Sequence, residues 1–204
     1  MAESTSYAAE IVTRKLVRPR LHIVYPQVGR LKNTVAQKVI NFDIQRKVYE
    51  LIAKQGYAKE PRMEVTGDYE IQLHQKGLVS LTLENYAYVQ GAAHGLTLQS
   101  AVTANLNDGQ IYRLKDLFRP ESDYRAVVSD IIKRQINEKE IPLINEFHQI
   151  GEDQDFYVTD TAVVIFFQVY EYTPYVYGNP AFPIPFGELR EIISKTGPLP
   201  RLMK

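Results

Sequence analysis

The sequence of 204 residues contains no cysteine. This absence excludes disulfide bonds, thiolate metal sites and a cysteine nucleophile, but it leaves the redox compartment open. The sequence also has no excess of charge, because 24 basic residues balance 24 acidic residues. Nucleic-acid binders are usually basic, so neither DNA nor RNA is expected as the main partner.

Long apolar runs are absent as well. No stretch approaches the roughly 18 consecutive apolar residues that a membrane-spanning helix needs. The opening residues MAESTSYAAE are polar and lack the basic and apolar regions of a signal peptide. We therefore expect no membrane-spanning segment within this chain.

The common catalytic motifs are missing too. The sequence has no GxSxG elbow or SxxK pair for a serine nucleophile, and Ser80 and Ser100 are expected to face solvent within alternating strands. No GxxxxGK[ST] or GxGxxG motif suggests a nucleotide site. No HExxH-type pair suggests a metal site.

The elements that the sequence does predict are strands and two amphipathic helices. Residues 10–28 are expected to form two short strands, and a long helix should follow Gly29 and end near Gly56. A hairpin over 64–88 should turn at QKG, and a further strand over 96–106 should end at NDG. The long helix carries these apolar residues, which are expected to form one ridge: Leu31, Val35, Val39, Ile40, Phe42, Ile44, Val48, Leu51 and Ile52.

The C-terminal half is expected to add a second amphipathic helix after Pro120 and a doubly covered strand over 161–170. Strands and helices are grouped rather than alternating. The fold class is therefore predicted to be α+β, with antiparallel sheets and two main amphipathic helices packed against them. We expect an N-terminal lobe over 10–80, a C-terminal lobe over 81–195 and a tail over 196–204.

The segment QGAAHGLT, residues 90–97, surrounds His94 with small residues. As an isolated histidine it is a poor metal ligand, since the other three histidines lie far away in the sequence. The favoured interpretation is a tight backbone crossing. Gly91 and Gly95 would allow a positive φ or a close approach, and the imidazole would bond to a backbone carbonyl.

Other candidate binding residues come from two tyrosine-rich stretches, which include Tyr170, and from an acidic connection over 140–160 that lacks lysine and arginine. Tyrosine suits protein surfaces and sugars, although the same rings could simply cover a sheet. The acidic connection could attract a basic partner or be a solvated loop. The candidate binding residues are Tyr86, Tyr88, His94, Tyr172, Tyr175, Tyr177, Glu152, Asp153 and Asp155.

An enzymatic alternative remains open. A glycan-acting hydrolase could use two carboxylates, for which Glu84 and Glu171 are candidates, or His94 together with an acid such as Glu84. Such a site requires a concave pocket in which two titratable groups lie within hydrogen-bonding reach of each other.

Three segments together resemble a known pair of domains of unknown function. They are YVQGAAHGLT, NLNDGQIYRLKDLFRPESDY and FQVYEYTPYVYGNPAFPIPFGEL. The combination is similar to the extracytoplasmic, lysozyme-binding part of RsiV-type anti-sigma factors and to the N-terminal region of PdaC-type peptidoglycan deacetylases. Ala92 departs from the pattern, because a second glycine usually stands there.

The resemblance implies a non-catalytic recognition or sensing module of a bacterial cell envelope. It implies an extracytoplasmic location, either secreted or anchored through a segment outside this chain. The implied partner is an envelope protein or a peptidoglycan fragment, with lysozyme as one candidate, and no cofactor or metal is implied. A glycan-acting hydrolase or a deacetylase-associated enzyme is the alternative.

Overall fold

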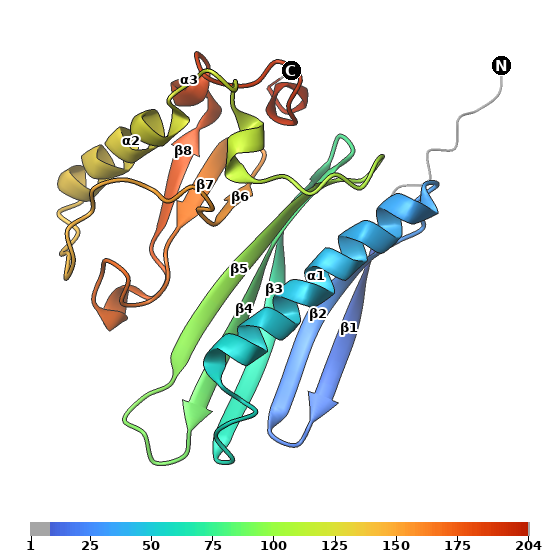
Figure 1. Ribbon diagram of the computed structural model, residues 1–204, viewed down its shortest axis with the longest axis vertical. Helices are drawn as coiled ribbons and strands as arrows, with labels where there is room; N and C mark the ends of the chain where they lie inside the picture. Colours follow the sequence, from blue (N-terminus) through green and yellow to red (C-terminus); the bar gives the residue numbers. More distant parts are fainter. Residues whose placement is uncertain (1–8, 204) are drawn as a thin grey trace.

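The computed structural model describes residues 9–203, which form two sheets and the helices that cover them. The first sheet has the strand order β1-β2-β3-β4-β5 and the second has the order β6-β7-β8 (Figure 1). Neighbouring strands are antiparallel except for β2 and β3, which are parallel because α1 connects them as a crossover. The predicted α+β class is confirmed. The strands and helices are β1 (Glu10–Arg18), β2 (Leu21–Gly29), α1 (Thr34–Gln55), β3 (Met63–Gln75), β4 (Leu78–Val89), β5 (Leu96–Asn105), α2 (Tyr124–Glu138), β6 (Phe156–Val158), β7 (Ala162–Phe166), β8 (Ala181–Pro185) and α3 (Phe186–Leu189).

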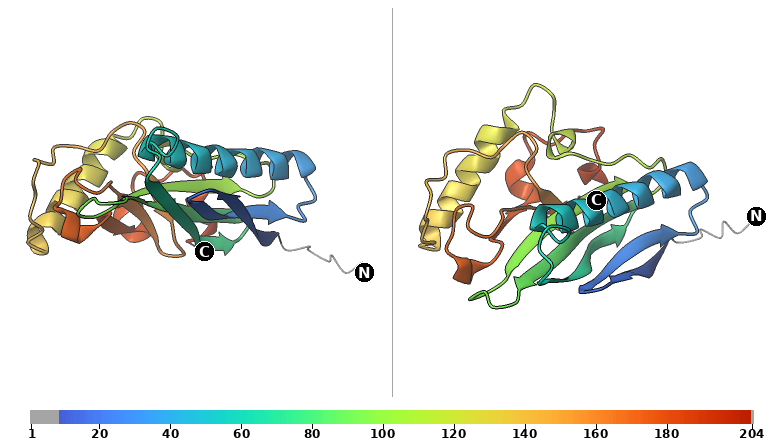
Figure 2. Two further views of the ribbon diagram at one scale, coloured as in Figure 1. Left: turned by 90° about the horizontal axis from the view of Figure 1, so that it is seen from below. Right: turned by 60° about the horizontal axis from the view of Figure 1, so that its bottom comes forward.

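Helix α1 lies along one face of the first sheet (Figure 2). The Asn33 side chain caps its start by accepting hydrogen bonds from the N–H groups of Val35 and Ala36, both at 3.1 Å. Gly56 ends it in the left-handed conformation, with φ of 80°, as the sequence predicted. The residues that face the sheet are Ala36, Ile40, Ile44, Val48, Leu51 and Ile52.

One part of the predicted apolar ridge is wrong. Val35, Val39 and Phe42 are exposed to 67%, 43% and 69%. Successive helix residues are rotated by about 100°, so these three lie on roughly the opposite side of α1 from Ile40 and Ile44. Because only one side can face the sheet, α1 has an exposed apolar stripe.

The second sheet packs against the face of the first sheet that α1 leaves uncovered. β6 contacts β3, β4 and β5, and therefore crosses that face. Ser80 lies at the junction: its Oγ is 2.8 Å from Thr103 Oγ1 and accepts a hydrogen bond from the Val158 N–H at 2.9 Å. The expectation that Ser80 faces solvent is wrong, because it is fully buried.

The predicted second helix is confirmed as α2, and the predicted buried strand is confirmed as β7, in the centre of its sheet with all five residues buried. Two apolar clusters form, one between α1 and the first sheet and one around α2, β7 and β8. The lobe boundary expected at residue 80 falls within β4, and the tail includes Leu199, which is buried in the second cluster. Within residues 9–203, no helix combines the length and apolarity needed to cross a bilayer.

Candidate functional site

The GAAHG segment forms the turn between β4 and β5, and its backbone passes close to Tyr86. A Cβ built on Gly95 would lie 2.4 Å from Tyr86 Cζ and 2.5 Å from the carbonyl oxygen of Ala87. The Gly95 N–H donates to the Tyr86 hydroxyl at 3.2 Å. Gly91 takes a φ of 93°, which glycine adopts without strain. The expected close approach of the backbone is confirmed.

His94 is exposed and its ring is oriented by three neighbours. Nδ1 lies 2.9 Å from the Gly95 carbonyl oxygen, and because a carbonyl can only accept, Nδ1 carries the proton of this bond. In the neutral ring Nε2 can then accept from the Tyr170 hydroxyl, which lies 3.4 Å away. The imidazole also packs against Tyr175, with ring centroids 4.3 Å apart. The ring thus joins the GAAHG turn to the loop after β7.

An exposed aromatic surface surrounds this histidine. The centroids of Tyr170 and Tyr175 are 5.7 Å apart. Val176 is 84% exposed, and Tyr177 beside it is 44% exposed. Tyr170 takes a positive φ of 67°, an uncommon conformation for a residue with a side chain. We define the aromatic surface as His94, Tyr170, Tyr175, Val176 and Tyr177.

Gln168 positions the loop that carries these tyrosines. The Gln99 N–H on β5 donates to Gln168 Oε1 at 3.0 Å, and Gln168 Nε2 donates to the Gln99 carbonyl at 2.9 Å. The side-chain amide therefore bonds to the open edge of β5 as a neighbouring strand would. Glu171 adds to the turn by accepting from the Gln168 N–H at 2.9 Å.

The remaining predicted tyrosines are not part of the aromatic surface, although the hydroxyls of Tyr86 and Tyr88 bond to the GAAHG turn. Tyr86 and Tyr88 stand on β4 and, together with Glu64 and Thr66, line a hollow of about 340 Å³. The ring of Tyr172 packs edge-on against Phe147 and Phe167 at the second apolar cluster. The candidate binding residues predicted from the sequence did not include Val176. Its place between two tyrosines, in a turn bounded by Pro174 and Gly178, was visible in the sequence.

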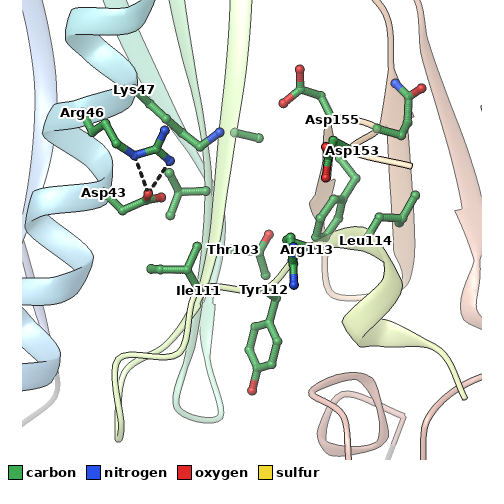
Figure 3. Close-up of a pocket in the computed structure, with 14 residues that line it drawn as sticks. Asp43, Arg46, Lys47, Thr103, Ile111, Tyr112, Arg113, Leu114, Asp153 and Asp155 are labelled. Carbon is green, nitrogen blue, oxygen red and sulfur yellow. Dashed lines mark hydrogen bonds and ion pairs between the residues drawn. The ribbon is translucent and has the colours of Figure 1, made fainter. Parts of the chain in front are cut away.

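A charged groove lies at the edge of β5, between α1 and the acidic connection (Figure 3). Its volume is about 350 Å³. Arg46 is held by Asp43 and Glu50, each at 2.5 Å. Lys47 Nζ donates to Ser100 Oγ at 3.2 Å. The charged residues that line the groove are Asp43, Arg46, Lys47, Arg113, Asp153 and Asp155.

The acidic side of the groove continues into an adjoining hollow of about 410 Å³, which shares Asp153 and Asp155 and adds Glu171. Burial raises the pKa of the Asp155 carboxyl, while Lys47 and Lys54 partly oppose the shift. Partial burial likewise raises the pKa of Glu171. Glu152 is exposed in the preceding turn and lines neither hollow.

The geometry gives little support to the enzymatic alternative. The hydrogen bonds of the His94 ring go to the Gly95 carbonyl and the Tyr170 hydroxyl, and none joins it to Glu84 in the part of the chain that the structure describes. Glu84 pairs across the strands with Asp68; burial, and then the Asp68 charge, raise its pKa. Glu171 lines the hollow that adjoins the groove, whereas Glu84 lines neither the groove nor that hollow. Among residues 9–203, no group of three or more potential metal ligands comes together.

Comparisons with known proteins agree with the sequence motifs. Residues 17–97 match the family model described as Deacetylase PdaC, and residues 115–187 match the one described as Protein of unknown function (DUF3298). The Anti-sigma-V factor RsiV of Bacillus subtilis is 29% identical over 175 residues, which are 80% of this chain. The match spans 60% of that relative's length. The predicted resemblance to the RsiV-type and PdaC-type pair of domains is confirmed.

Two solved structures share the fold. A DUF3298-family protein from Bacteroides fragilis superposes with a TM-score of 0.66 at 15% identity, over 96% of each chain. A DUF3298-family protein from Pseudomonas aeruginosa gives a TM-score of 0.61 at 17% identity, over 95% of each chain. The two-layer arrangement therefore recurs in chains whose sequences differ widely.

Proposed function

Because the chain pairs a PdaC-like part with a DUF3298-like part, we propose that it is a non-catalytic recognition module of a bacterial cell envelope. It acts outside the cytoplasm and binds a protein partner through the aromatic surface. Similarity to an anti-sigma factor over most of this chain supports a sensing or binding role. The observation that carries the proposal is the exposure of four neighbouring residues, Tyr170, Tyr175, Val176 and Tyr177.

A protein partner suits this surface better than a sugar. Sugar binding by aromatic residues uses free ring faces, whereas one face of Tyr175 already packs against His94. Val176 is 84% exposed, more than any of the three tyrosines, and burying an aliphatic side chain against a partner removes apolar area from water. Because tyrosines surround it, they can exclude water from that contact.

The test replaces Val176 by aspartate. Placing a charge at the centre of an interface should weaken binding at least about tenfold, equivalent to about 1.4 kcal/mol. Val17→Asp makes the same chemical change at a valine on β1 that is 61% exposed, and serves as the matched control. Both variants should melt within about 1–2 °C of the wild type, since neither side chain belongs to a core.

The measurement is affinity capture from envelope extract, with purified C-type lysozyme and peptidoglycan fragments as separate arms. A protein retained by the wild type and by Val17→Asp but released by Val176→Asp supports the proposal. Equal retention by all three would refute the assignment of the aromatic surface. Binding of peptidoglycan fragments alone, with the same dependence on Val176, would replace the protein partner by a glycan.

A further inference from the structure

The charged groove joins the two parts of the chain, and in residues 9–203 neither its Lys47 nor its Asp155 forms an ion pair. One wall comes from α1, in the PdaC-like part, and the other comes from residues 153–156, in the DUF3298-like part (Figure 3). Ligand sites often form where two such units meet, because both contribute side chains to one concave surface. The aromatic surface shares none of the residues that line the groove.

Asp155 is the first unpaired group. It is half-buried, and in residues 9–203 its carboxylate makes no hydrogen bond and no ion pair. Lys47 and Lys54 are close enough to act on it electrostatically, but neither forms an ion pair with it. In Figure 3 the Lys47 amino group and the Asp155 carboxylate point toward each other from opposite walls. The space between them suits a group that bonds to both.

Asp43 is the second unpaired group. The residue is only 8% exposed, and its Oδ1 accepts from Arg46. Its Oδ2 is buried without a hydrogen-bond partner among the described residues. Buried polar atoms are normally hydrogen-bonded, and one without a partner destabilises the folded state. Asp43 thus adds an incompletely satisfied carboxylate to the α1 wall of the groove.

The distribution of charge selects the ligand. The groove is lined by three carboxylates, on Asp43, Asp153 and Asp155, and by three cations, on Arg46, Lys47 and Arg113. Arg46 and Asp43 pair with each other, but in residues 9–203 Lys47 and Asp155 form no ion pair. A ligand with a single charge would leave one set of groups desolvated and unpaired, whereas a ligand with both charges pairs with both. The adjoining hollow is also lined by Gln149 and Gln154, whose amides can bond to a peptide group, whereas the Gln168 amide there is already bonded to Gln99.

From these observations we infer that the charged groove binds a short peptide, or a single amino acid, that has a free amine and a free carboxylate. The amine lies at Asp155 and the carboxylate at Lys47. The peptide group of a longer ligand lies in the adjoining hollow, beside Gln149 and Gln154. This inference does not depend on the aromatic surface or on its partner.

The test uses alanyl-alanine as the probe and follows backbone amide shifts in an NMR titration of the whole chain. The free dipeptide should shift amides that line the groove, and its N-acetylated and C-amidated forms should each bind at least about tenfold more weakly. Alanine alone is a further arm. Binding of alanine as tight as that of the dipeptide would identify the ligand as an amino acid.

Two variants test which side chain binds the amine of the dipeptide and which binds its carboxylate. Asp155→Asn should weaken the free dipeptide at least about tenfold but should hardly change the weak binding of the N-acetylated form, since that form has no charged amine. Lys47→Gln should likewise weaken the free dipeptide at least about tenfold but should hardly change the weak binding of the C-amidated form, since that form has no charged carboxylate. Asp160→Asn and Lys15→Gln remove one exposed charge of each sign elsewhere and should bind like the wild type.

The inference is overturned if no probe shifts the amides of the groove, or if blocked and free dipeptides bind equally. It is also overturned if Asp155→Asn and Lys47→Gln bind the free dipeptide as the wild type does, because Lys47 and Asp155 would then serve only each other. Val176→Asp should leave dipeptide binding unchanged. The proposed function and the groove can therefore fail independently.

Discussion

At the scale of single residues, Gly95 determines whether the β4–β5 turn can reach its position. The backbone at this point lies against the Tyr86 ring and the Ala87 carbonyl, which leaves no room for a methyl group. The same approach sets the direction of His94, because the ring bonds to the Gly95 carbonyl. One small residue thus connects the sheet to the aromatic surface.

Gly95→Ala should therefore destabilise the fold. The new Cβ would have to displace backbone or a packed ring, which costs about 1–3 kcal/mol. Urea unfolding measures the loss. Gly151→Ala is the control, because a Cβ there meets nothing within 4 Å and its φ is not in the left-handed region. If the two variants lost the same stability, the close approach at Gly95 would not be a constraint on folding.

The residue-level predictions from the sequence succeeded where the chemistry is local. Small residues on both sides of His94 indicated a close backbone approach, and Gly95 shows it. The contacts of His94 with Tyr170 and Tyr175 could not be predicted, because they join residues about 80 positions apart. The positive φ of Tyr170 could not be predicted either, because tyrosine has no preference for this backbone conformation.

At the scale of elements, most helices and strands followed from periodicity and turn residues, but the buried face of α1 and the burial of both faces of β4 did not. Helix α1 ends at Gly56 as predicted, yet it carries two apolar stripes and periodicity alone could not show which one faces the sheet. The prediction that Ser80 faces solvent was wrong for a similar reason. Alternation gave it the opposite face of the strand from Val79 and Leu81, but the presence of β6 on that face was not visible in the sequence.

Ser80→Ala tests this junction between the sheets. Removing the hydroxyl leaves the buried Val158 N–H without an acceptor and takes the partner from Thr103, at a cost of about 1–3 kcal/mol. The midpoint of urea unfolding should fall while the slope stays constant. Ser100→Ala, at a partly exposed serine on β5, should cost less than half as much. Similar losses for the two serines would mean that the Ser80 hydroxyl is not important for docking of β6.

At the scale of the whole molecule, the groove depends on how the two layers are held together. Its charged walls come from α1 and from a connection more than 100 residues later, and Gln168 bonds the loop after β7 to the edge of β5. The sequence indicated the acidic connection as a candidate site. It could not indicate the opposing lysine and arginine residues of α1, because their position follows from packing of the two layers.

The Asp155 carboxyl of the groove should also make the stability of the fold depend on pH. Burial raises the pKa of Asp155 in the folded protein above the ordinary value of 3.8. The folded state therefore binds this proton more tightly than the unfolded state, so the contribution of Asp155 to stability is greatest at low pH and is lost as pH rises through the raised pKa. Lys47 and Lys54 oppose this effect without cancelling it.

Replacing Asp155 by asparagine removes the buried charge, so Asp155→Asn should be more stable than the wild type at neutral pH. The difference between the two should shrink as the pH is lowered toward 3.8, because the wild-type carboxyl then becomes neutral as well. Thermal melts from pH 7 to pH 3.5 measure it, and Asp160→Asn controls for the loss of one exposed charge. A variant less stable than the wild type at pH 7 would show that the lysines of α1 outweigh the burial. The Asp155 carboxylate would then be satisfied within the chain, and the groove would have no unpaired charge to offer an amine.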